Sequence, residues 1–242
     1  MSKLVKPVTF LAVILICFTT VAFSQAKSGG KLDMSERIFD FGLVPQESRV
    51  VHNFMLKNVG DAEVNITEIK PNCGCTTAPV DENKIAPGDS TVMEVTFKSG
   101  RRTGKQEKFV NVTTDMEPRG LFRIVIQAWV ETPTQRTPPL TSEPRTIEYA
   151  PRDMKHRGKS EVTLKNNSDE TLELEIAGYY EPLGHPELKG NSLKPGETTK
   201  LVYDFNVVDN NKLEYGAVTV NAKGEEIDLN YTVPITKVRV KK

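Results

Sequence analysis

The chain repeats itself at a shift of 108 residues, and this repeat limits its possible architectures more than any other feature. Without a gap, ten identities fall between Phe39 and Phe97, about three times the number expected from unrelated sequences. The identical pairs are Arg49/Arg157, Leu56/Leu164, Lys57/Lys165, Asn58/Asn166, Asp61/Asp169, Asn83/Asn191, Pro87/Pro195, Gly88/Gly196, Thr91/Thr199 and Phe97/Phe205. The repeat predicts two copies of one structural unit.

The N-terminus has the pattern of a secretory signal peptide. Lys3 and Lys6 precede an apolar run from Val8 to Phe23, and Ala22-Phe23-Ser24 offers small residues for cleavage. The run of about 16 residues is shorter than the roughly 20 of a membrane-spanning helix, which makes an uncleaved anchor the less favoured alternative. We therefore expect a periplasmic, secreted or cell-surface protein with no membrane span after cleavage.

A proline-rich stretch separates the two predicted copies. Its four prolines, between Thr132 and Pro144, favour an extended and semi-rigid linker. Cleavage of the signal peptide would leave about 218 residues, roughly twice the shift, so we expect no third domain. The predicted organisation is a signal peptide over residues 1–24, a first domain over 36–131, a linker over 132–144 and a second domain over 145–238.

Apolar residues alternate with period two in both copies, as in half-buried strands. The alternating sets are Met93, Val95 and Phe97 in the first copy, and Leu172, Leu174, Ile176, Leu201, Tyr203 and Phe205 in the second. Further strands are predicted over residues 49–58, 63–69, 106–114 and 121–130. No segment of helical length has a 3.6-residue period. Six or seven strands in each unit of roughly 100 residues predict an all-β fold of two tandem immunoglobulin-like β-sandwiches.

The charge balance and residue counts argue against several function classes. The 32 basic and 32 acidic residues create no strong field toward nucleic acid or an anionic membrane. Three histidines and three cysteines leave few ligands for a metal. Carboxylates such as Glu94 and Glu173 alternate with core positions and indicate solvated strand faces. We therefore expect no nucleic-acid partner, no cofactor, no metal and no catalytic residue.

Two kinds of loop are predicted from glycine and proline. Pro87-Gly88 and Pro195-Gly196 precede equivalent strands and predict tight turns, because proline fixes one backbone angle and glycine permits a positive one. The segment from Gly100 to Lys105 is one residue too short between its glycines for a phosphate-binding loop, and Gln106 stands in place of the required Ser or Thr. This segment instead predicts a hairpin loop with a basic tip.

The element Cys73-Gly74-Cys75-Thr76 is the one candidate for chemistry. The third cysteine lies in the predicted signal peptide, so Cys73 and Cys75 are the two that remain after cleavage. At the same shift of 108, the second copy has Glu181-Pro182-Leu183-Gly184. The thiols are therefore not required by the fold of the repeated unit.

Three interpretations of Cys73 and Cys75 remain open, because their spacing does not determine the state of the thiols. In an oxidising compartment they could close a local disulfide, whose small ring contributes less than the usual stabilisation and is easier to reduce than a long-range bridge. The same lability could serve disulfide exchange with clients, or the thiolates could hold a soft ion such as Cu(I), although His52 or Met55 could approach them only through the fold. They could also be small buried apolar residues at a bend.

The order and spacing of four motifs resemble a known family over about Arg37 to Val130. The motifs are Leu56-Lys57-Asn58-Val59-Gly60-Asp61, Ile66-Thr67-Glu68-Ile69 leading to Cys73-Gly74-Cys75-Thr76, Ile85-Ala86-Pro87-Gly88-Asp89, and Gly104 before Phe109-Val110-Asn111-Val112. This pattern is similar to the bacterial "domain of unknown function 1573" family, which is common in exported Bacteroidetes proteins and related to the immunoglobulin-like ASH-type domains of cilia-associated proteins. The resemblance implies a fold and a bacterial source but no activity, and the second copy lacks the cysteine element.

These features favour an exported, non-enzymatic interaction or scaffold protein of the bacterial envelope. Two sandwiches would present long edge strands and loops to a protein partner, whose identity the sequence does not give. One alternative is a thiol redox or soft-metal protein that uses Cys73 and Cys75. Another is a two-domain periplasmic assembly chaperone, for which Arg101 and Arg102 are weak candidates for the required basic pair.

Overall fold

The computed structural model describes residues 29–116, 120–132, 137–149, 158–206 and 215–237. In this part of the chain every regular element is a strand except η1, a turn of 3-10 helix at Glu181–Leu183. The predicted all-β class is therefore confirmed. The predicted signal peptide lies outside the described residues, and nowhere within them is there a helix with the length and apolar character needed to cross a membrane.

Among the described residues, nine strands precede the proline-rich stretch and nine follow Pro139. The first set is β1 (Leu32–Asp33), β2 (Ile38–Pro45), β3 (Arg49–Asn58), β4 (Val64–Pro71), β5 (Thr76–Thr77), β6 (Lys84–Ile85), β7 (Ser90–Lys98), β8 (Gly104–Thr114) and β9 (Leu121–Glu131). The second set is β10 (Leu140–Glu143), β11 (Ile147–Tyr149), β12 (Lys159–Asn166), β13 (Leu172–Tyr179), β14 (Gly184–Leu188), β15 (Ser192–Leu193), β16 (Thr198–Phe205), β17 (Tyr215–Lys223) and β18 (Asp228–Lys237). We call the described residues up to 132 the N-terminal half and those from 137 the C-terminal half.

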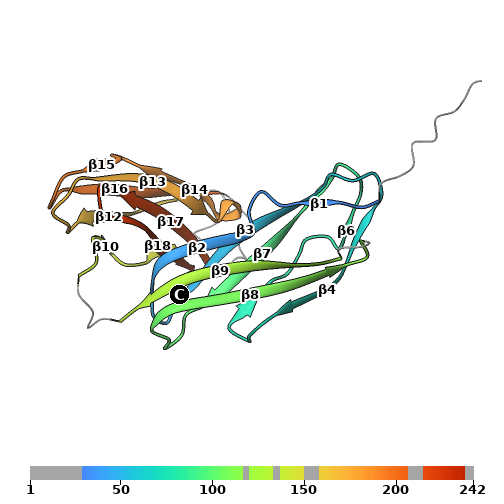
Figure 1. Cartoon of the computed structure of the whole chain (residues 1–242). Helices are drawn as coiled ribbons and strands as arrows, with labels where there is room; N and C mark the ends of the chain where they lie inside the picture. Colours follow the sequence, from blue (N-terminus) through green and yellow to red (C-terminus); the bar gives the residue numbers. More distant parts are fainter. Residues whose placement is uncertain (1–28, 117–119, 133–136, 150–157, 207–214, 238–242) are drawn as a thin grey trace, which may run out of the picture.

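The strands form two separate four-stranded sheets and one ten-stranded sheet that runs through both halves (Figure 1). The order is β1-β3-β7-β5 in the N-terminal small sheet and β10-β12-β16-β14 in the C-terminal one. The large sheet has the order β15-β13-β17-β18-β2-β9-β8-β4-β6, with β11 paired to β18. Each half is thus a sandwich of a small sheet against part of the large one.

Each half has its own hydrophobic core, to which both of its sheets contribute. The predicted inward residues Met93, Val95 and Phe97 are buried in the N-terminal core, together with Val110 and Ile124 of the large sheet. In the C-terminal core, Leu172, Leu174, Leu201, Tyr203 and Phe205 are buried as predicted, and Ile176 packs against them while partly exposed. Burial of one face of each strand explains the alternation seen in the sequence.

The two halves keep the same strand register at the shift of 108. Phe54 pairs with Met93 across β3 and β7, and Val162 pairs with Leu201 across β12 and β16. Both predicted Pro-Gly turns form, and Gly88 and Gly196 have positive φ angles of 87° and 79°. The positive angle explains the glycine at both positions.

A buried asparagine holds the same loops together in each half. The Nδ2 group of Asn58 donates to the carbonyls of Ala62 and Ile85, at 2.8 and 2.9 Å. Asn166 Nδ2 donates to the carbonyls of Glu170 and Leu193 at the same two distances. All three positions of the second set lie 108 residues after those of the first. The identities in the sequence therefore include residues that fix loop structure, while the predicted domain boundaries remain predictions.

The halves join where β18 lies beside β2. Thr232 Oγ1 donates to the Phe41 carbonyl at 2.6 Å, and Asn230 Nδ2 donates to the Asp40 carbonyl at 2.7 Å. The backbones are so close that a Cβ on Gly42 would lie 1.7 Å from the Asn230 carbonyl oxygen. Because the Thr232 bond is buried and the two backbones are in close contact at Gly42, the two sandwiches meet through a packed junction.

Two predictions about the connections were wrong in detail. Leu140–Glu143, expected within the extended linker, forms β10 and pairs with β12, because Leu140 is fully buried in the C-terminal core. The loop from Gly100 joins β7 in the small sheet to β8 in the large one, so it is a crossover between sheets and not a hairpin. Residues 133–136 of the expected linker lie outside the described residues.

The strands that end the sheets are short in the described residues, although β6 and β15 cover only two residues each of the longer strands β4 and β13. The outermost strands of the three sheets are β1, β5, β6, β10, β14 and β15, which are two to five residues long. Short edge strands present few unpaired backbone groups to another chain. Several of them are too short to show alternation, which is why the sequence predicted six or seven strands per unit instead of nine.

Candidate functional site

Cys73 and Cys75 form a disulfide in the loop between β4 and β5, with their Cα atoms 5.2 Å apart. Cys75 is 7% exposed and belongs to the N-terminal core, whereas Cys73 is partly exposed and packs against the edge of that core. The interpretation of both as unbonded, packed thiols does not match this structure. The pair is instead a bonded disulfide with one sheltered and one more accessible cysteine.

Hydrogen bonds on both sides of the disulfide hold its loop in place. The Asn72 backbone N–H donates to the Phe109 carbonyl at 2.9 Å, and Asn72 Oδ1 accepts from the Phe109 N–H at 3.2 Å. On the other side, the Lys98 N–H donates to the Cys75 carbonyl at 2.9 Å. These bonds do not depend on the sulfur bridge, so the two cysteines are held close by the surrounding backbone as well.

The Thr76 hydroxyl faces both sulfur atoms. Thr76 is buried, and its Oγ1 lies 3.6 Å from Cys73 Sγ and 3.9 Å from Cys75 Sγ. Sulfur in a disulfide is a weak hydrogen-bond acceptor, so this buried hydroxyl is only weakly satisfied while the bridge is closed. The residue completes the Cys-Gly-Cys-Thr element, which the C-terminal half lacks.

The other residues considered from the sequence lie elsewhere. His52 stacks on Phe39 with ring centroids 3.6 Å apart, and its Nε2 lies 2.9 Å from Glu36 Oε2. Met55 is exposed on β3. In the described part of the chain, no group of three or more histidine, cysteine or acidic side chains is placed to hold a metal ion.

Arg101 and Arg102 lie on the loop between the sheets. Arg101 is almost fully exposed and makes an ion pair of 3.5 Å with Glu47, while Arg102 donates to the carbonyls of Lys98 and Ser99 in its own loop. The structure does not bring the two side chains together against an exposed edge strand.

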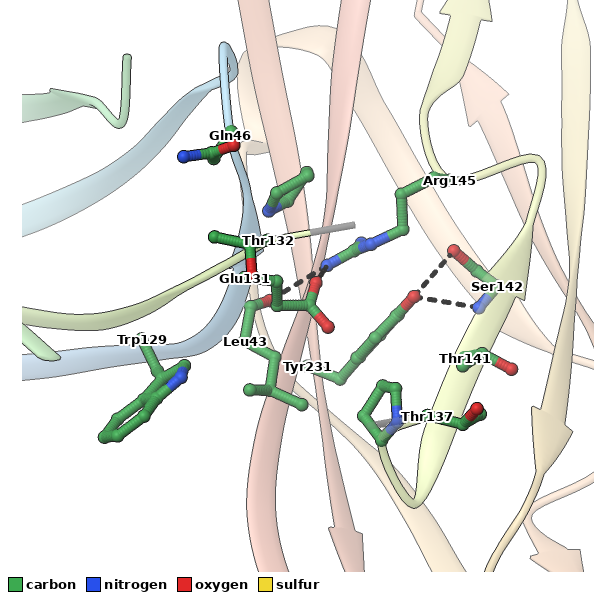
Figure 2. A pocket seen from close by; sticks show the side chains of 12 residues that line it. Leu43, Gln46, Trp129, Glu131, Thr132, Thr137, Thr141, Ser142, Arg145 and Tyr231 are labelled. Atoms are coloured by element: carbon green, nitrogen blue, oxygen red, sulfur yellow. Dashed lines mark hydrogen bonds and ion pairs between the residues drawn. The ribbon is translucent and has the colours of Figure 1, made fainter. Parts of the chain in front are cut away.

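A cleft of about 700 Å³ opens where the two halves meet (Figure 2). Its lining comes from β2 and the residue after it, from β9 and β18, and from the chain between β9 and β11: Leu43, Pro45, Gln46, Trp129, Glu131, Thr132, Thr137, Pro138, Thr141, Ser142, Arg145 and Tyr231. Figure 2 shows Trp129 on one side and Thr137, Thr141 and Ser142 on the other, with Arg145 and Tyr231 between them. The cleft is therefore built by tertiary contacts across the whole chain.

Arg145 holds the floor of the cleft together. Its guanidinium donates to Glu131 Oε2 at 2.7 Å, to the Leu43 carbonyl at 3.1 Å and to the Thr232 carbonyl at 2.6 Å. It also lies over the ring of Tyr231, 4.1 Å from the centroid. These contacts connect β2, β9 and β18, and they fix both ends of the proline-rich stretch. A planar, permanently charged guanidinium suits this combination of ion pair, carbonyl contacts and ring contact.

Burial raises the pKa of the Tyr231 phenol, and the nearby Arg145 cation opposes part of that rise. The Tyr231 oxygen accepts a hydrogen bond of 2.8 Å from the Ser142 backbone N–H. The phenol is thus held neutral as part of the cleft wall.

Trp129, the single tryptophan of the chain, is 46% exposed on the rim of the cleft. It was missed in the sequence, although a signal for it existed. Trp129 stands between Ala128 and Val130, which are both buried, so period-two alternation places the indole on the outer face of β9. Nothing in the sequence indicated that this outer face lies beside a cleft.

Residues 32–130 match the family model described as "Protein of unknown function (DUF1573)". The resemblance predicted from the four motifs is confirmed for this part of the chain. The match ends at the last residues of β9 and does not extend into the C-terminal half. The family description assigns no activity.

Solved structures with a similar arrangement are only distantly related. A protein of unknown function from Porphyromonas gingivalis W83 is 12% identical over 85% of this chain and 99% of its own, with a TM-score of 0.34. The YadV chaperone is 13% identical over 84% and 98%, with a TM-score of 0.30. The ASH / PapD-like domain 7 of human CEP192 is 14% identical over 54% and 94%, with a TM-score of 0.36. At these scores the likenesses support no functional assignment, and no curated protein sequence matches the chain.

Proposed function

We propose that this protein is an exported, non-enzymatic binding protein of the bacterial envelope and that it holds a protein partner in the cleft around Trp129. The carrying observation is the exposed indole on the rim of a preformed cleft between the halves. Tryptophan is among the residues that contribute most to protein interfaces, because it buries a large apolar area with little loss of side-chain freedom. Leaving it half exposed beside a cleft is best explained by a partner that covers it.

The construction of the cleft supports binding by a preformed surface. Arg145 ties three strands together beneath it, so the lining residues need little rearrangement when a partner arrives. A surface that is already ordered loses less conformational entropy on association. On the wall opposite Trp129, the exposed Thr137 offers a hydroxyl to a polypeptide backbone, while the Ser142 and Thr141 hydroxyls are bonded to Tyr231 and Asn167.

The charged groups of the cleft favour binding over catalysis. Among the described lining residues, Glu131 and Arg145 carry the permanent charges, and they are paired with each other at 2.7 Å. An acid or base engaged in a structural ion pair is not free to transfer a proton to a substrate. The assembly-chaperone alternative is less favoured, because the candidate basic pair is engaged within its own region: Arg101 pairs with Glu47, and Arg102 donates to carbonyls of its own loop.

Site-specific photocrosslinking in the native cell tests this proposal. A photoreactive phenylalanine analogue at position 129 or 46 should give one discrete crosslinked product, and the same analogue at Leu121 should give none. Leu121 is a matched control because it lies on the same strand and is 66% exposed. Trp129→Ala should abolish the product formed from position 46. Equal crosslinking from all three positions, or none from any, would refute a binding site in this cleft.

Two measurements complete the test. Because Trp129 is the single tryptophan, its fluorescence reports directly on the cleft, and adding the purified partner should shift the emission. The proposed export is checked separately by fractionating the cells and sequencing the N-terminus of the mature protein, which we expect at Gln25. An uncleaved protein in the cytoplasm would contradict export without affecting the cleft.

A further inference from the structure

We propose that the Cys73–Cys75 disulfide is a redox centre that passes its disulfide to an exported polypeptide carrying two free thiols. This inference is independent of the cleft and rests on three features of the loop between β4 and β5. These are the unequal exposure of the two cysteine residues, the open space beside Gly74 and the position of the Thr76 hydroxyl.

Unequal exposure assigns a direction to the exchange. Cys73 is partly exposed, while Cys75 is buried in the N-terminal core. A thiolate attacks along the line of the sulfur–sulfur bond, so the accessible sulfur is the one attacked and the sheltered one leaves. Cys73 is thus the sulfur that forms the mixed disulfide, and Cys75 is the leaving thiolate.

Gly74 leaves room for the incoming chain. A Cβ at this position would meet nothing within 4 Å, and Gly74 does not have the positive φ that would require glycine. Neither packing nor backbone conformation therefore explains this glycine. The open side gives a client thiol access between the two cysteines.

The Thr76 hydroxyl is a hydrogen-bond donor beside both sulfur atoms. It is buried, and the two sulfurs, 3.6 and 3.9 Å away, are its hydrogen-bond partners in the described structure. A hydroxyl donates much more strongly to a thiolate than to a disulfide sulfur, because the acceptor is charged. The hydroxyl lies within reach of both sulfurs, slightly closer to Cys73 Sγ than to Cys75 Sγ, so it stabilises a thiolate on either cysteine, including Cys75 when that sulfur leaves.

The loop is also built to survive reduction. The hydrogen bonds of Asn72 with Phe109, and of Cys75 with Lys98, hold the backbone without the bridge. In the C-terminal half, the Leu183 carbonyl accepts from the Asn206 N–H at 2.8 Å and Gly184 pairs with Phe205, so the same contacts form with no sulfur at all. Reduction therefore leaves two thiols close together in a folded protein, ready to be oxidised again.

The exchange balances in two steps. A client thiolate attacks Cys73 Sγ, the bond between Cys73 and Cys75 breaks, and Cys75 leaves as a thiolate. The second client thiolate then attacks the client sulfur of the mixed disulfide and releases Cys73. The client loses two electrons and gains a disulfide, while Cys73 and Cys75 take up the two electrons and the two protons that the client thiols released. Each oxidised protein molecule converts one client dithiol.

The test uses the purified mature chain and a reduced, unstructured peptide with two cysteines. Acid quenching and mass spectrometry follow peptide oxidation, with the same concentration of oxidised glutathione as the reference. We expect the protein to oxidise the peptide at least about tenfold faster than glutathione does. A rate equal to or below that of glutathione would overturn the proposal. A peptide with one cysteine stops after the first step, and its mixed disulfide should map to Cys73; mapping to Cys75 would refute the direction.

Two matched variants measure how much the Thr76 hydroxyl contributes to the rate of peptide oxidation. Thr76→Val keeps the shape and removes the donor, and it should slow peptide oxidation by about tenfold, whereas Thr76→Ser should stay within about twofold of the wild type. A Thr76→Val variant with wild-type rate would refute the role of the hydroxyl. If Thr76→Val does not fold, the wild type alone decides: alkylation of the reduced protein should show a thiol that ionises below the ordinary cysteine pKa, and an ordinary or raised value would overturn the assignment.

Discussion

The loops after β4 and β13 occupy the same place in the two halves, 108 residues apart, yet only the first carries sulfur. Thr76 pairs with Phe97 at the start of β5, and Gly184 pairs with Phe205 at the start of β14. Cys75 and Leu183 are both buried at equivalent positions. The fold therefore needs an apolar side chain and a strand start here, and Leu183 provides the first without a thiol. The cysteine element is an addition to a scaffold that works without it.

The largest effect on stability should come from disturbing the junction between the N-terminal and C-terminal halves. In Gly42→Ala, the new Cβ would overlap the Asn230 backbone of the other half, and the φ of 61° adds strain. We expect a loss of about 4 kcal/mol in the free energy of unfolding, measured by urea denaturation. Gly88→Ala is the control, because its φ is also positive but its Cβ would face open space, and it should cost only about 1 kcal/mol. Equal losses would show that the junction contributes nothing beyond local strain.

The next largest effect tests whether the two scaffolds are equivalent. Asn58→Ala and Asn166→Ala each leave one buried and one partly buried carbonyl without their donor, and each should cost about 3 kcal/mol. Asn167→Ala, at an exposed neighbouring position, should cost less than about 0.5 kcal/mol. Losses that differ by more than about 1.5 kcal/mol between Asn58 and Asn166 would break the comparison.

Alkaline pH should distinguish the halves, because all six tyrosines lie in the C-terminal one. Burial raises the pKa of Tyr180, Tyr203 and Tyr231 above the ordinary value of 10, and the hydrogen bond of Tyr180 to Glu94 adds to its rise. A raised folded pKa means that the stabilisation is complete below pH 10 and is lost as the pH rises above it, since the unfolded chain ionises first. We expect the free energy of unfolding to fall above pH 10.

The variant Tyr203→Phe sharpens this pH test. It removes hydrogen bonds to the Tyr180 and Gly184 carbonyls and should cost about 1.5 kcal/mol at pH 7. It should also reduce the decline above pH 10, because one buried phenol is gone. Circular dichroism of urea unfolding at several pH values measures both effects. An unchanged pH dependence would contradict the role of Tyr203 burial.

Reducing the disulfide should have the smallest effect on stability. The bridge closes a loop of very few residues, so its opening should cost less than about 1 kcal/mol. The matched comparison is Leu183→Ala, which empties the equivalent position in the other half and should cost about 3 kcal/mol. Urea midpoints with and without a reductant provide the measurement. A loss on reduction as large as that of Leu183→Ala would make the bridge a structural element and weaken the redox proposal.

Much of the fold followed from local patterns, but less of the candidate sites did. The alternation around Met93 and Leu201 predicted strands whose inward faces are buried in the structure. The strand β10 was hidden by its surrounding prolines, and two-residue strands such as β5 are too short to have a period. Cys73 and Cys75 were found because they are chemically unusual, whereas the neighbouring hydroxyl of Thr76 acquires meaning only from its distance to the sulfurs.

By itself, the sequence determined the all-β class, the shift of 108 and the restriction of the cysteine element to one half. These properties are carried by neighbouring residues and by chain composition, so they can be read without knowing which segments meet. Only the tertiary structure decided that β18 lies beside β2, that Arg145 reaches Glu131 and that Trp129 borders a cleft. Such contacts depend on the pairing of strands far apart in the chain, and alternation says which face a residue occupies but not which strand lies next to it.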